Sequence, residues 1–249
     1  METSDPERPS PPGGSSFVTT HWTRVLEARG SSPESRAALS ELCQAYYAPV
    51  VAFLRRGGAG EDLARDEAHS FFAHILERNA LEGVERDRGR FRSYLLGALK
   101  HFLARAREHE QRRKRGGGTI SVPLDSGTDS EPGLSLPDPN SLPPDEYFDR
   151  QWALTVLERA LTRVEGEWKE AGRGADFQAL KPWLTGDAAH GDQTAVAVAL
   201  GMSDGAVKVA VHRMRRRFRE AVRQEVAQTL NTPDQVAAEV RQLFTALGG

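Results

Sequence analysis

The chain has 249 residues, of which 39% are hydrophobic and 27% charged, and its formal net charge is −2. This length suits one large or two small helical domains, and the near-neutral total means that any attraction to nucleic acid must come from segregated charge. The single Cys43 excludes an intramolecular disulfide and a cysteine-based zinc knuckle.

Residues 1–16 are rich in Pro, Ser and Gly, and they predict a disordered N-terminal tail. This segment is acidic and proline-rich, whereas a signal peptide is basic and then apolar. No uninterrupted apolar run in the chain approaches the length of a membrane span. We therefore expect a cytoplasmic protein with no membrane contact.

Apolar residues recur at helical spacing over residues 17–118, which predicts a first helical domain. Three long helices are expected, in "RAALSELCQAYYAPVVAFLRR", in "EDLARDEAHSFFAHILER" and in "RGRFRSYLLGALKHFLARAREHEQRRKR". Pro49 and the following glycines punctuate the first of them, and three glycines at 116–118 end the last.

The third of these helices is strongly basic. Residues 88–115 hold ten Lys or Arg against Glu108 and Glu110, a net charge of +8. Phe91, Tyr94 and Phe102 lie among the basic residues. Basic side chains interleaved with aromatic rings suit single-stranded nucleic acid, because nucleobases stack on aromatic rings and phosphates pair with basic side chains. The alternative is that each aromatic ring is simply a core residue.

Residues 119–144 are rich in Pro, Gly, Ser and Asp, and they predict a flexible linker. Helical patterning resumes over 145–230, the expected second domain, and a short amphipathic helix is expected over 231–249. No β-alternation of any length is present. The predicted fold is therefore all-α, with two small helical domains joined by the linker.

The stretch "QTAVAVALGMSDGAVKVAVHRMRRRF" has the helix, glycine, helix pattern of a helix-turn-helix. Gly201 can take the left-handed conformation that the turn needs, and Ser203 can cap the second helix. Gly205 and Ala206 are small enough at the start of that helix to let its backbone approach a major groove. The pattern predicts a DNA-reading helix.

The second helix separates apolar from basic residues. At 100° per residue, an apolar stripe within about 60° of Val207 holds Val211, Met214, Phe218 and Val222. A basic flank at roughly 80° to 180° holds Lys208, His212, Arg215, Arg216 and Arg219. Residues 208–223 contain seven Lys or Arg and one acid, Glu220, whereas a merely solvated helix usually mixes both signs. Residues 145–192 are acidic, and their negative charge offsets the basic segments, so the net charge of the chain is near zero.

A catalytic role finds little support in the motifs. His69, His74, Glu67 and Glu77 fall on one expected helix, but the two histidines are five residues apart rather than the four that place ligands on one face. No G-x-S-x-G, Walker or dinucleotide-binding pattern is present. We expect no enzyme, no cofactor and no metal, with a metal-dependent helical hydrolase as the remote rival.

Together these segments resemble bacterial RNA polymerase sigma factors of the extracytoplasmic function (ECF) type. The block 17–118, with "FVTTHWTRVLEA", "ERDRGRFRSYLLGALKHFLA" and "RRKRGGG", is similar to sigma region 2, a helical bundle that binds core polymerase and melts the minus-10 element. The block 145–230 is similar to sigma region 4, a helix-turn-helix that recognises the minus-35 element.

The resemblance implies a role for each of three residue groups. Core-polymerase binding is implied for Asp62, Asp66, Phe71, Phe72 and Leu76. Minus-10 recognition and melting is implied for Arg88, Arg90, Phe91, Arg92, Tyr94, Lys100, His101 and Arg105. Minus-35 recognition is implied for Ser203, Gly205, Ala206, Lys208, His212, Arg213 and Arg216.

The implied partners are core RNA polymerase, through its β′ and β subunits, and promoter DNA, with an anti-sigma factor or other regulator as a further candidate. The chain departs from the family pattern in two places. His69-Ser70 replaces a Gln-Glu pair, and His101 and Arg105 stand where many members have Asn and Asp. The alternative function is a helix-turn-helix transcriptional regulator that does not engage polymerase.

Overall fold

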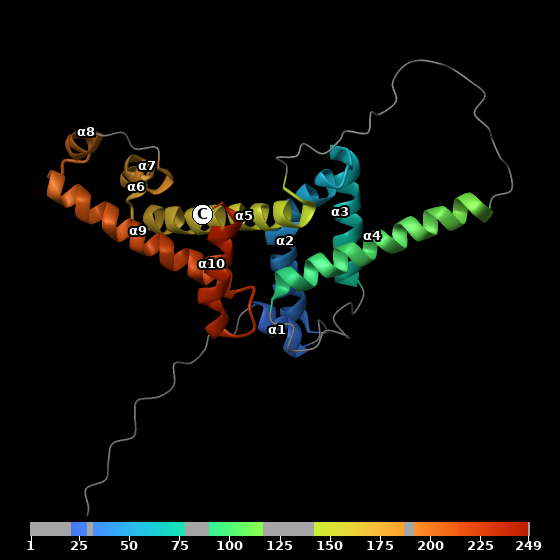
Figure 1. Ribbon diagram of the computed structural model, residues 1–249. Helices are drawn as coiled ribbons and strands as arrows, with labels where there is room; N and C mark the ends of the chain where they lie inside the picture. Colours follow the sequence, from blue (N-terminus) through green and yellow to red (C-terminus); the bar gives the residue numbers. More distant parts are fainter. Residues whose placement is uncertain (1–20, 29–31, 78–89, 117–141, 187–191, 249) are drawn as a thin grey trace, which may run out of the picture.

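The computed structural model describes residues 21–28, 32–77, 90–116, 142–186 and 192–248, and this part of the chain is helical with no strand. The all-α prediction is confirmed for it. Figure 1 shows the helices in chain order: α1 (His21–Ala28), α2 (Pro33–Arg56), α3 (Glu61–Glu77), α4 (Phe91–Gly116), α5 (Pro144–Glu170), α6 (Gly174–Leu180), α7 (Pro182–Thr185), α8 (Asp192–Ala199), α9 (Asp204–Ala227), a 3-10 turn (Pro233–Gln235) and α10 (Val236–Ala246).

The start of α2 follows from its local sequence. Ser32 caps the helix, since its Oγ accepts a hydrogen bond from the Ser35 amide at 3.1 Å, and Pro33 takes the first turn, where no amide hydrogen is needed. The expected punctuation at Pro49 is wrong, because the helix continues through this buried proline to Arg56. A helix held on both sides by tertiary packing tolerates the hydrogen bond that proline removes.

Helices α1 to α4 pack around aromatic side chains. The Phe91 ring lies 5.0 Å from the Trp22 ring and 5.1 Å from the Tyr46 ring, and the Phe71 and Phe102 rings are 5.6 Å apart. These edge-to-face pairs join α4 to the rest of the bundle through long side chains. The core interpretation therefore holds for the Phe91 ring, which is fully buried.

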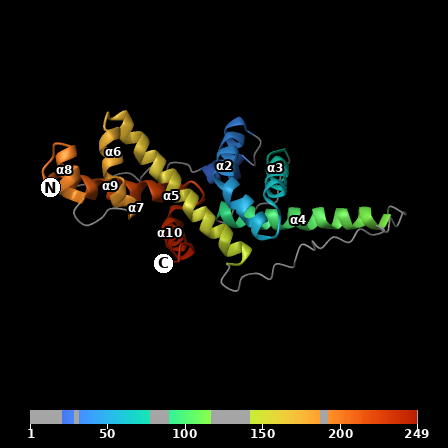
Figure 2. The ribbon, with the colours of Figure 1, turned by 90° about the horizontal axis from the view of Figure 1, so that it is seen from above.

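The long helix α5 packs against both halves of the molecule (Figure 2). Near its start, the Phe148 ring lies 6.3 Å from Tyr46 and 6.4 Å from Phe53, both on α2. Near its end, the Trp168 ring lies 6.1 Å from Phe177 on α6. The predicted boundary at residue 145 therefore does not separate two cores, because the first turns of α5 complete the first bundle.

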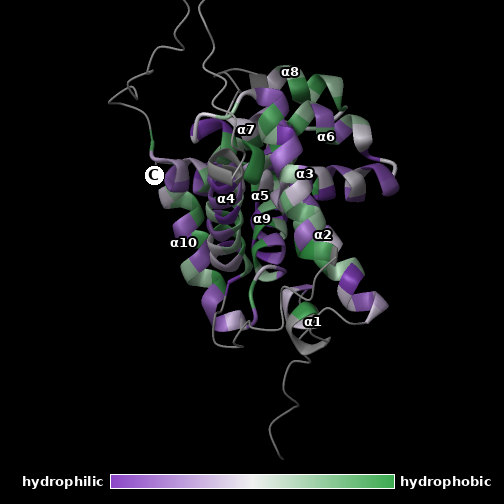
Figure 3. Cartoon of the chain, turned by 90° about the vertical axis from the view of Figure 1, so that its right-hand side faces the viewer, coloured by the Kyte–Doolittle hydropathy of each residue, from purple (hydrophilic) through white to green (hydrophobic). Residues whose placement is uncertain are grey.

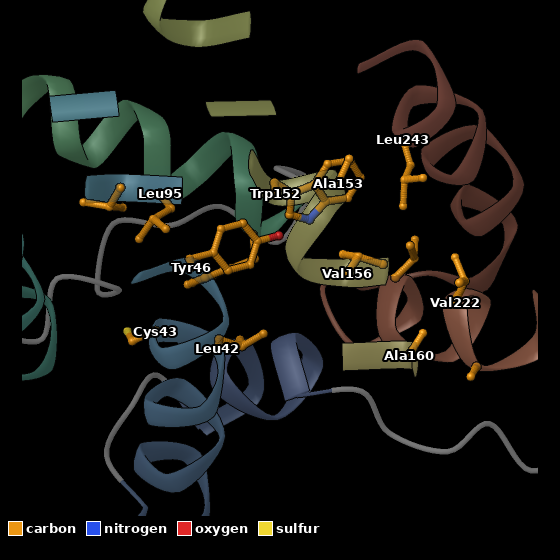
Figure 4. Close-up of a cluster of buried hydrophobic side chains, with 14 of the residues drawn as sticks. Leu42, Cys43, Tyr46, Leu95, Trp152, Ala153, Val156, Ala160, Val222 and Leu243 are labelled. Atoms are coloured by element: carbon orange, nitrogen blue, oxygen red, sulfur yellow. The ribbon is translucent and has the colours of Figure 1, made fainter. Parts of the chain in front are cut away.

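As a result, the buried apolar residues in the described part of the chain form one continuous hydrophobic core. Figure 4 shows its centre, which receives side chains from α2, α4, α5, α9 and α10: Leu42, Cys43, Tyr46, Leu95, Trp152, Ala153, Val156, Ala160, Val222 and Leu243. Polar and apolar residues alternate along the helices, as amphipathic packing requires (Figure 3). The division into two small domains is thus not confirmed, and α10 joins the common core.

Among the described residues, α2 is the one unbroken helix that is long and apolar enough to cross a membrane, and half of its most apolar stretch is buried inside the fold. The bent pair of α8 and α9 passes the same test if it is counted as one span. A core helix passes the same test, so the absence of a membrane span stays a prediction. The predicted tail 1–16 and nearly all of the predicted linker 119–144 lie outside the described residues.

We expect Phe148→Ala to lower the free energy of unfolding by about 3–5 kcal/mol, because it leaves a cavity between α2 and α5. Helix content and tryptophan fluorescence should report one coincident transition during chemical denaturation. The matched control is Leu154→Ala on the same helix, which should cost much less because 43% of Leu154 is exposed. Two separate transitions, only one of them shifted, would show two independent domains instead.

Candidate nucleic-acid interface

Helices α8 and α9 form a helix-turn-helix with an angle of 98° between them. Gly201 takes a left-handed φ of 62°, as the sequence predicted. Two amides close the turn, since Gly201 N donates to the Val198 carbonyl at 3.2 Å and Met202 N donates to the Ala197 carbonyl at 2.8 Å. The angle lies in the range that places the second helix of this motif in a DNA groove.

Side chains then hold the second helix in place. Ser203 caps α9, with its Oγ accepting from the Ala206 amide at 3.2 Å. Gln193 on α8 donates from Nε2 to the Asp204 carbonyl at 3.0 Å. The stripe of Val207, Val211 and Met214 is buried against the fold. The predicted cap and the predicted apolar stripe are both confirmed.

All seven residues of the implied minus-35 group are exposed, and they share the first half of α9 and its cap: Ser203, Gly205, Ala206, Lys208, His212, Arg213 and Arg216. Among the described residues, no ion pair or hydrogen bond engages the side chains of Lys208, His212, Arg213 or Arg216. Four basic or polar side chains therefore stand free on one face of a helix that begins with small residues.

Two other arginines of α9 have structural roles. Arg215 donates twice to the Trp183 carbonyl, from Nε at 3.1 Å and from Nη2 at 2.9 Å. Arg217 donates from Nε to Glu167 at 2.7 Å, and this hydrogen bond is the main cause that lowers the pKa of Glu167. Some basic side chains of α9 thus attach the helix to α5 and α7, whereas others face solvent.

Val209, which neither the sequence pattern nor the resemblance had singled out, is 49% exposed in the middle of this face. Its methyl groups are of the kind that contact the C5-methyl group of thymine in a major groove. Val209 also lines a groove of about 390 Å³ with Trp168, Arg173, Met202 and Arg213. Its position about 200° from the buried Val207 on a helical wheel could have predicted this exposure.

The implied minus-10 residues are not brought together on a surface. Phe91 is fully buried and Arg92 is 7% exposed, so neither side chain can contact DNA in this arrangement. Arg90 pairs with Glu239 on α10, and Lys100 Nζ lies 2.5 Å from Asp145 Oδ2. The Phe91 ring packs against α1 and α2, whereas carboxylates of α5 and α10 pair with the three basic side chains. Arg88 lies outside the described residues.

The remaining members of that group lie further along α4. Tyr94 is half-buried and stacks on Trp22 at 5.6 Å, and burial raises the pKa of Tyr94 to about 12. His101 and Arg105 are exposed on α4, as are Arg107 and Arg112 further along. The later part of α4 projects beyond α3 (Figure 1), and these exposed side chains are accessible to a nucleic acid.

Arg92 is held on all sides by partners from other helices. Its guanidinium pairs with Asp149, donates from Nε to Glu239 at 3.0 Å, and lies 4.6 Å over the Trp152 ring. Burial alone would lower the pKa of Arg92, but the hydrogen bond that Arg92 donates to Asp149 and the two negative charges outweigh it and raise the pKa. Arg92 is therefore a buried, charged structural residue in this arrangement.

The implied polymerase-binding residues on α3 divide in the same way. Asp62 and Asp66 are exposed, and Leu76 is 40% exposed. Phe71 is fully buried and Phe72 is 7% exposed, because both rings pack inside the bundle. The prediction that Phe71 and Phe72 contact a partner directly is therefore wrong for this arrangement. The two aspartates, in contrast, are accessible on an acidic face.

The histidines of α3 have other neighbours. His69 Nε2 lies 3.0 Å from the Tyr47 hydroxyl, with the two rings stacked, and the His74 ring lies 5.7 Å from the Phe102 ring. Among the described residues, no group of three His, Cys, Asp or Glu side chains is placed to hold a metal ion.

Comparison of the chain with protein-family models, with curated proteins and with solved structures gives no match.

We expect Ser203→Ala to destabilise the start of α9 by about 1 kcal/mol, because the Ala206 amide loses its acceptor. Hydrogen exchange at the first turn of α9 measures this directly, and Ser203→Asp should retain the protection. Equal exchange in the Ala variant and the wild type would mean that the cap does not stabilise the turn.

Proposed function

We propose that this protein is a sigma factor of the ECF type, which directs core RNA polymerase to promoters and has no catalytic chemistry of its own. The observation that carries the proposal is the free basic face on the first half of α9, set at 98° to α8. The resemblance of residues 17–118 to sigma region 2 and of residues 145–230 to sigma region 4, in the right order, supports the polymerase part of the proposal.

In this proposal α9 reads the minus-35 element. B-DNA has a major groove about 12 Å wide, which admits one helix, and the N-terminal residues of a recognition helix meet the base edges there. Gly205 and Ala206 leave room for close approach. Lys208 and Arg213 would donate to guanine or to phosphates, and Val209 would meet a thymine methyl group.

Polymerase would bind the outer face of α3. Asp62, Asp66 and Ala73 lie within about 40° of one another on the helix, and all three are exposed. Leu63, 54% exposed, and Leu76 flank this stripe. An acidic stripe with apolar edges suits a basic, partly apolar surface such as a helical arm of a partner protein.

The second candidate is a helix-turn-helix regulator that never engages polymerase. The burial of Phe91 and Arg92 favours it, because these two side chains at the start of α4 are not accessible to a DNA strand in this arrangement. Such a regulator uses α9 in the same way, but it has no use for the acidic face of α3.

Arg213→Ala should weaken binding to a cognate duplex by about 1–3 kcal/mol if Arg213 contacts a base. The matched control is Arg223→Ala, an exposed arginine on the same helix about 15 Å further along, which should leave sequence preference unchanged. Selection from random duplexes, followed by titration, measures both effects. A loss that is equal for every sequence would make Arg213 a phosphate contact.

Asp66→Ala should weaken binding to core polymerase by about tenfold and lower specific run-off transcription, with duplex binding unchanged. Glu170→Ala, an exposed acid on α5, is the control for charge. Specific transcripts that depend on this protein and on Asp66 would establish the sigma function. Duplex binding with no polymerase binding by the wild type would instead select the regulator.

A further inference from the structure

The side chains of Arg90 and Arg92 converge on one carboxylate. Glu239 on α10 is completely buried, its Oε1 accepts from Arg92 Nε at 3.0 Å, and its Oε2 lies 3.0 Å from Arg90 Nη1. Two guanidiniums that share one anion form the same kind of site that binds a phosphate group, since both ligands offer paired anionic oxygens.

The backbone before α10 also contacts the start of α4. Phe91 N donates to the Thr229 carbonyl at 3.0 Å, and Arg90 forms an isolated antiparallel bridge with Leu230. Trp22 N donates to the Gln228 carbonyl at 3.1 Å. Residues 228–230 therefore bind the first residues of both α1 and α4, the ends of the bundle where the basic segment begins.

Apolar packing completes the attachment. Leu243 is fully buried and belongs to the same core as Tyr46, Trp152 and Val156 (Figure 4). Thus the segment from Gln228 to Leu247, here called the C-terminal clamp, combines backbone hydrogen bonds, a buried carboxylate and an apolar side chain. It contacts the backbone of Phe91 and the side chains of Arg90 and Arg92, in the segment whose charge and aromatic pattern are typical of single-strand binding.

We propose that the C-terminal clamp is an internal competitor for nucleic acid, in which Glu239 occupies the place of a phosphate between Arg90 and Arg92. The same guanidinium hydrogens cannot bind a carboxylate and a DNA phosphate together, so the start of α4 binds single-stranded DNA only when the clamp is released. This inference rests on the proposed function, because it regulates the promoter-opening segment and leaves the duplex-reading face free.

The two activities lie at opposite ends of α9. That helix has 24 residues, which corresponds to a length of roughly 36 Å, and α10 lies against the end remote from α8 (Figure 1). Clamp release therefore need not alter the face of Lys208 and Arg213. The protein in its closed arrangement can recognise duplex DNA, and single-strand capture follows when a partner or DNA displaces α10.

The test compares full-length variants for binding to a short fluorescent single-stranded DNA. Glu239→Gln removes the competing charge with little change of shape, and it should bind the strand about tenfold more tightly than the wild type. Asp234→Asn is the matched control, because it removes one exposed negative charge from the same segment without touching Arg90 or Arg92. It should bind like the wild type.

Two further variants locate the effect. Leu243→Ala weakens the docking of α10 without changing charge, and it should also tighten single-strand binding. The double variant Glu239→Gln, Arg90→Ala should lose the gain in single-strand affinity, because Arg90 is one of the two arginines that the substitution of Glu239 frees to bind DNA. In the wild type, saturating single-stranded DNA should increase hydrogen exchange along α10.

The proposal is overturned if Glu239→Gln keeps its helix content and both it and Leu243→Ala bind the strand as the wild type does. If Glu239→Gln does not fold, unchanged binding by Leu243→Ala, or unchanged exchange of α10 in the DNA-bound wild type, overturns it equally. Duplex and polymerase binding are measured on the same proteins. Their absence would refute the proposed function, whereas intact duplex and polymerase binding with no gain in single-strand binding would refute only the clamp.

Discussion

The burial of the Arg92 charge is the constraint on which the arrangement of this fold depends. A guanidinium keeps its proton at any ordinary pH, so it can be buried only with anionic partners and hydrogen-bond acceptors. Asp149 on α5 and Glu239 on α10 supply them, and the Trp152 ring covers the guanidinium. Removal of one partner from such a group typically costs about 3–5 kcal/mol. Three helices that are distant in the sequence are thereby joined at one charge.

That junction explains why the molecule has one core. Helix α5 is fixed at its start by Phe148 and Asp149 and further along by Glu167, whose carboxylate receives Arg217 of α9. Glu225 adds a second tie between α9 and α5, through Arg159 and Arg163. Because these contacts use only part of the basic charge of α9, the residues near its start remain free. The same helix is therefore held firmly and still presents a basic face.

Local features could be predicted from the sequence because nearby residues decide them. The turn at Gly201, the cap at Ser203 and the stripe of Val207, Val211 and Met214 depend on interactions within a few residues. The exposure of Lys208 and Arg213 follows from the same helical geometry. Phe91 and Arg92 could not be placed in this way, because a basic and aromatic pattern is the same whether its partner is DNA or a buried acid.

The helical class, the helix-turn-helix and the charged face of α9 follow from the order of the residues, since helix periodicity and turn chemistry are local. Long-range packing is what makes α5 part of the first bundle, turns Phe71 and Phe72 inward, and brings Glu239 to Arg90 and Arg92. Residues 92 and 239 are 147 positions apart, so no periodicity relates them. Only the packing of α10 into the common core brings the carboxylate to the two guanidiniums.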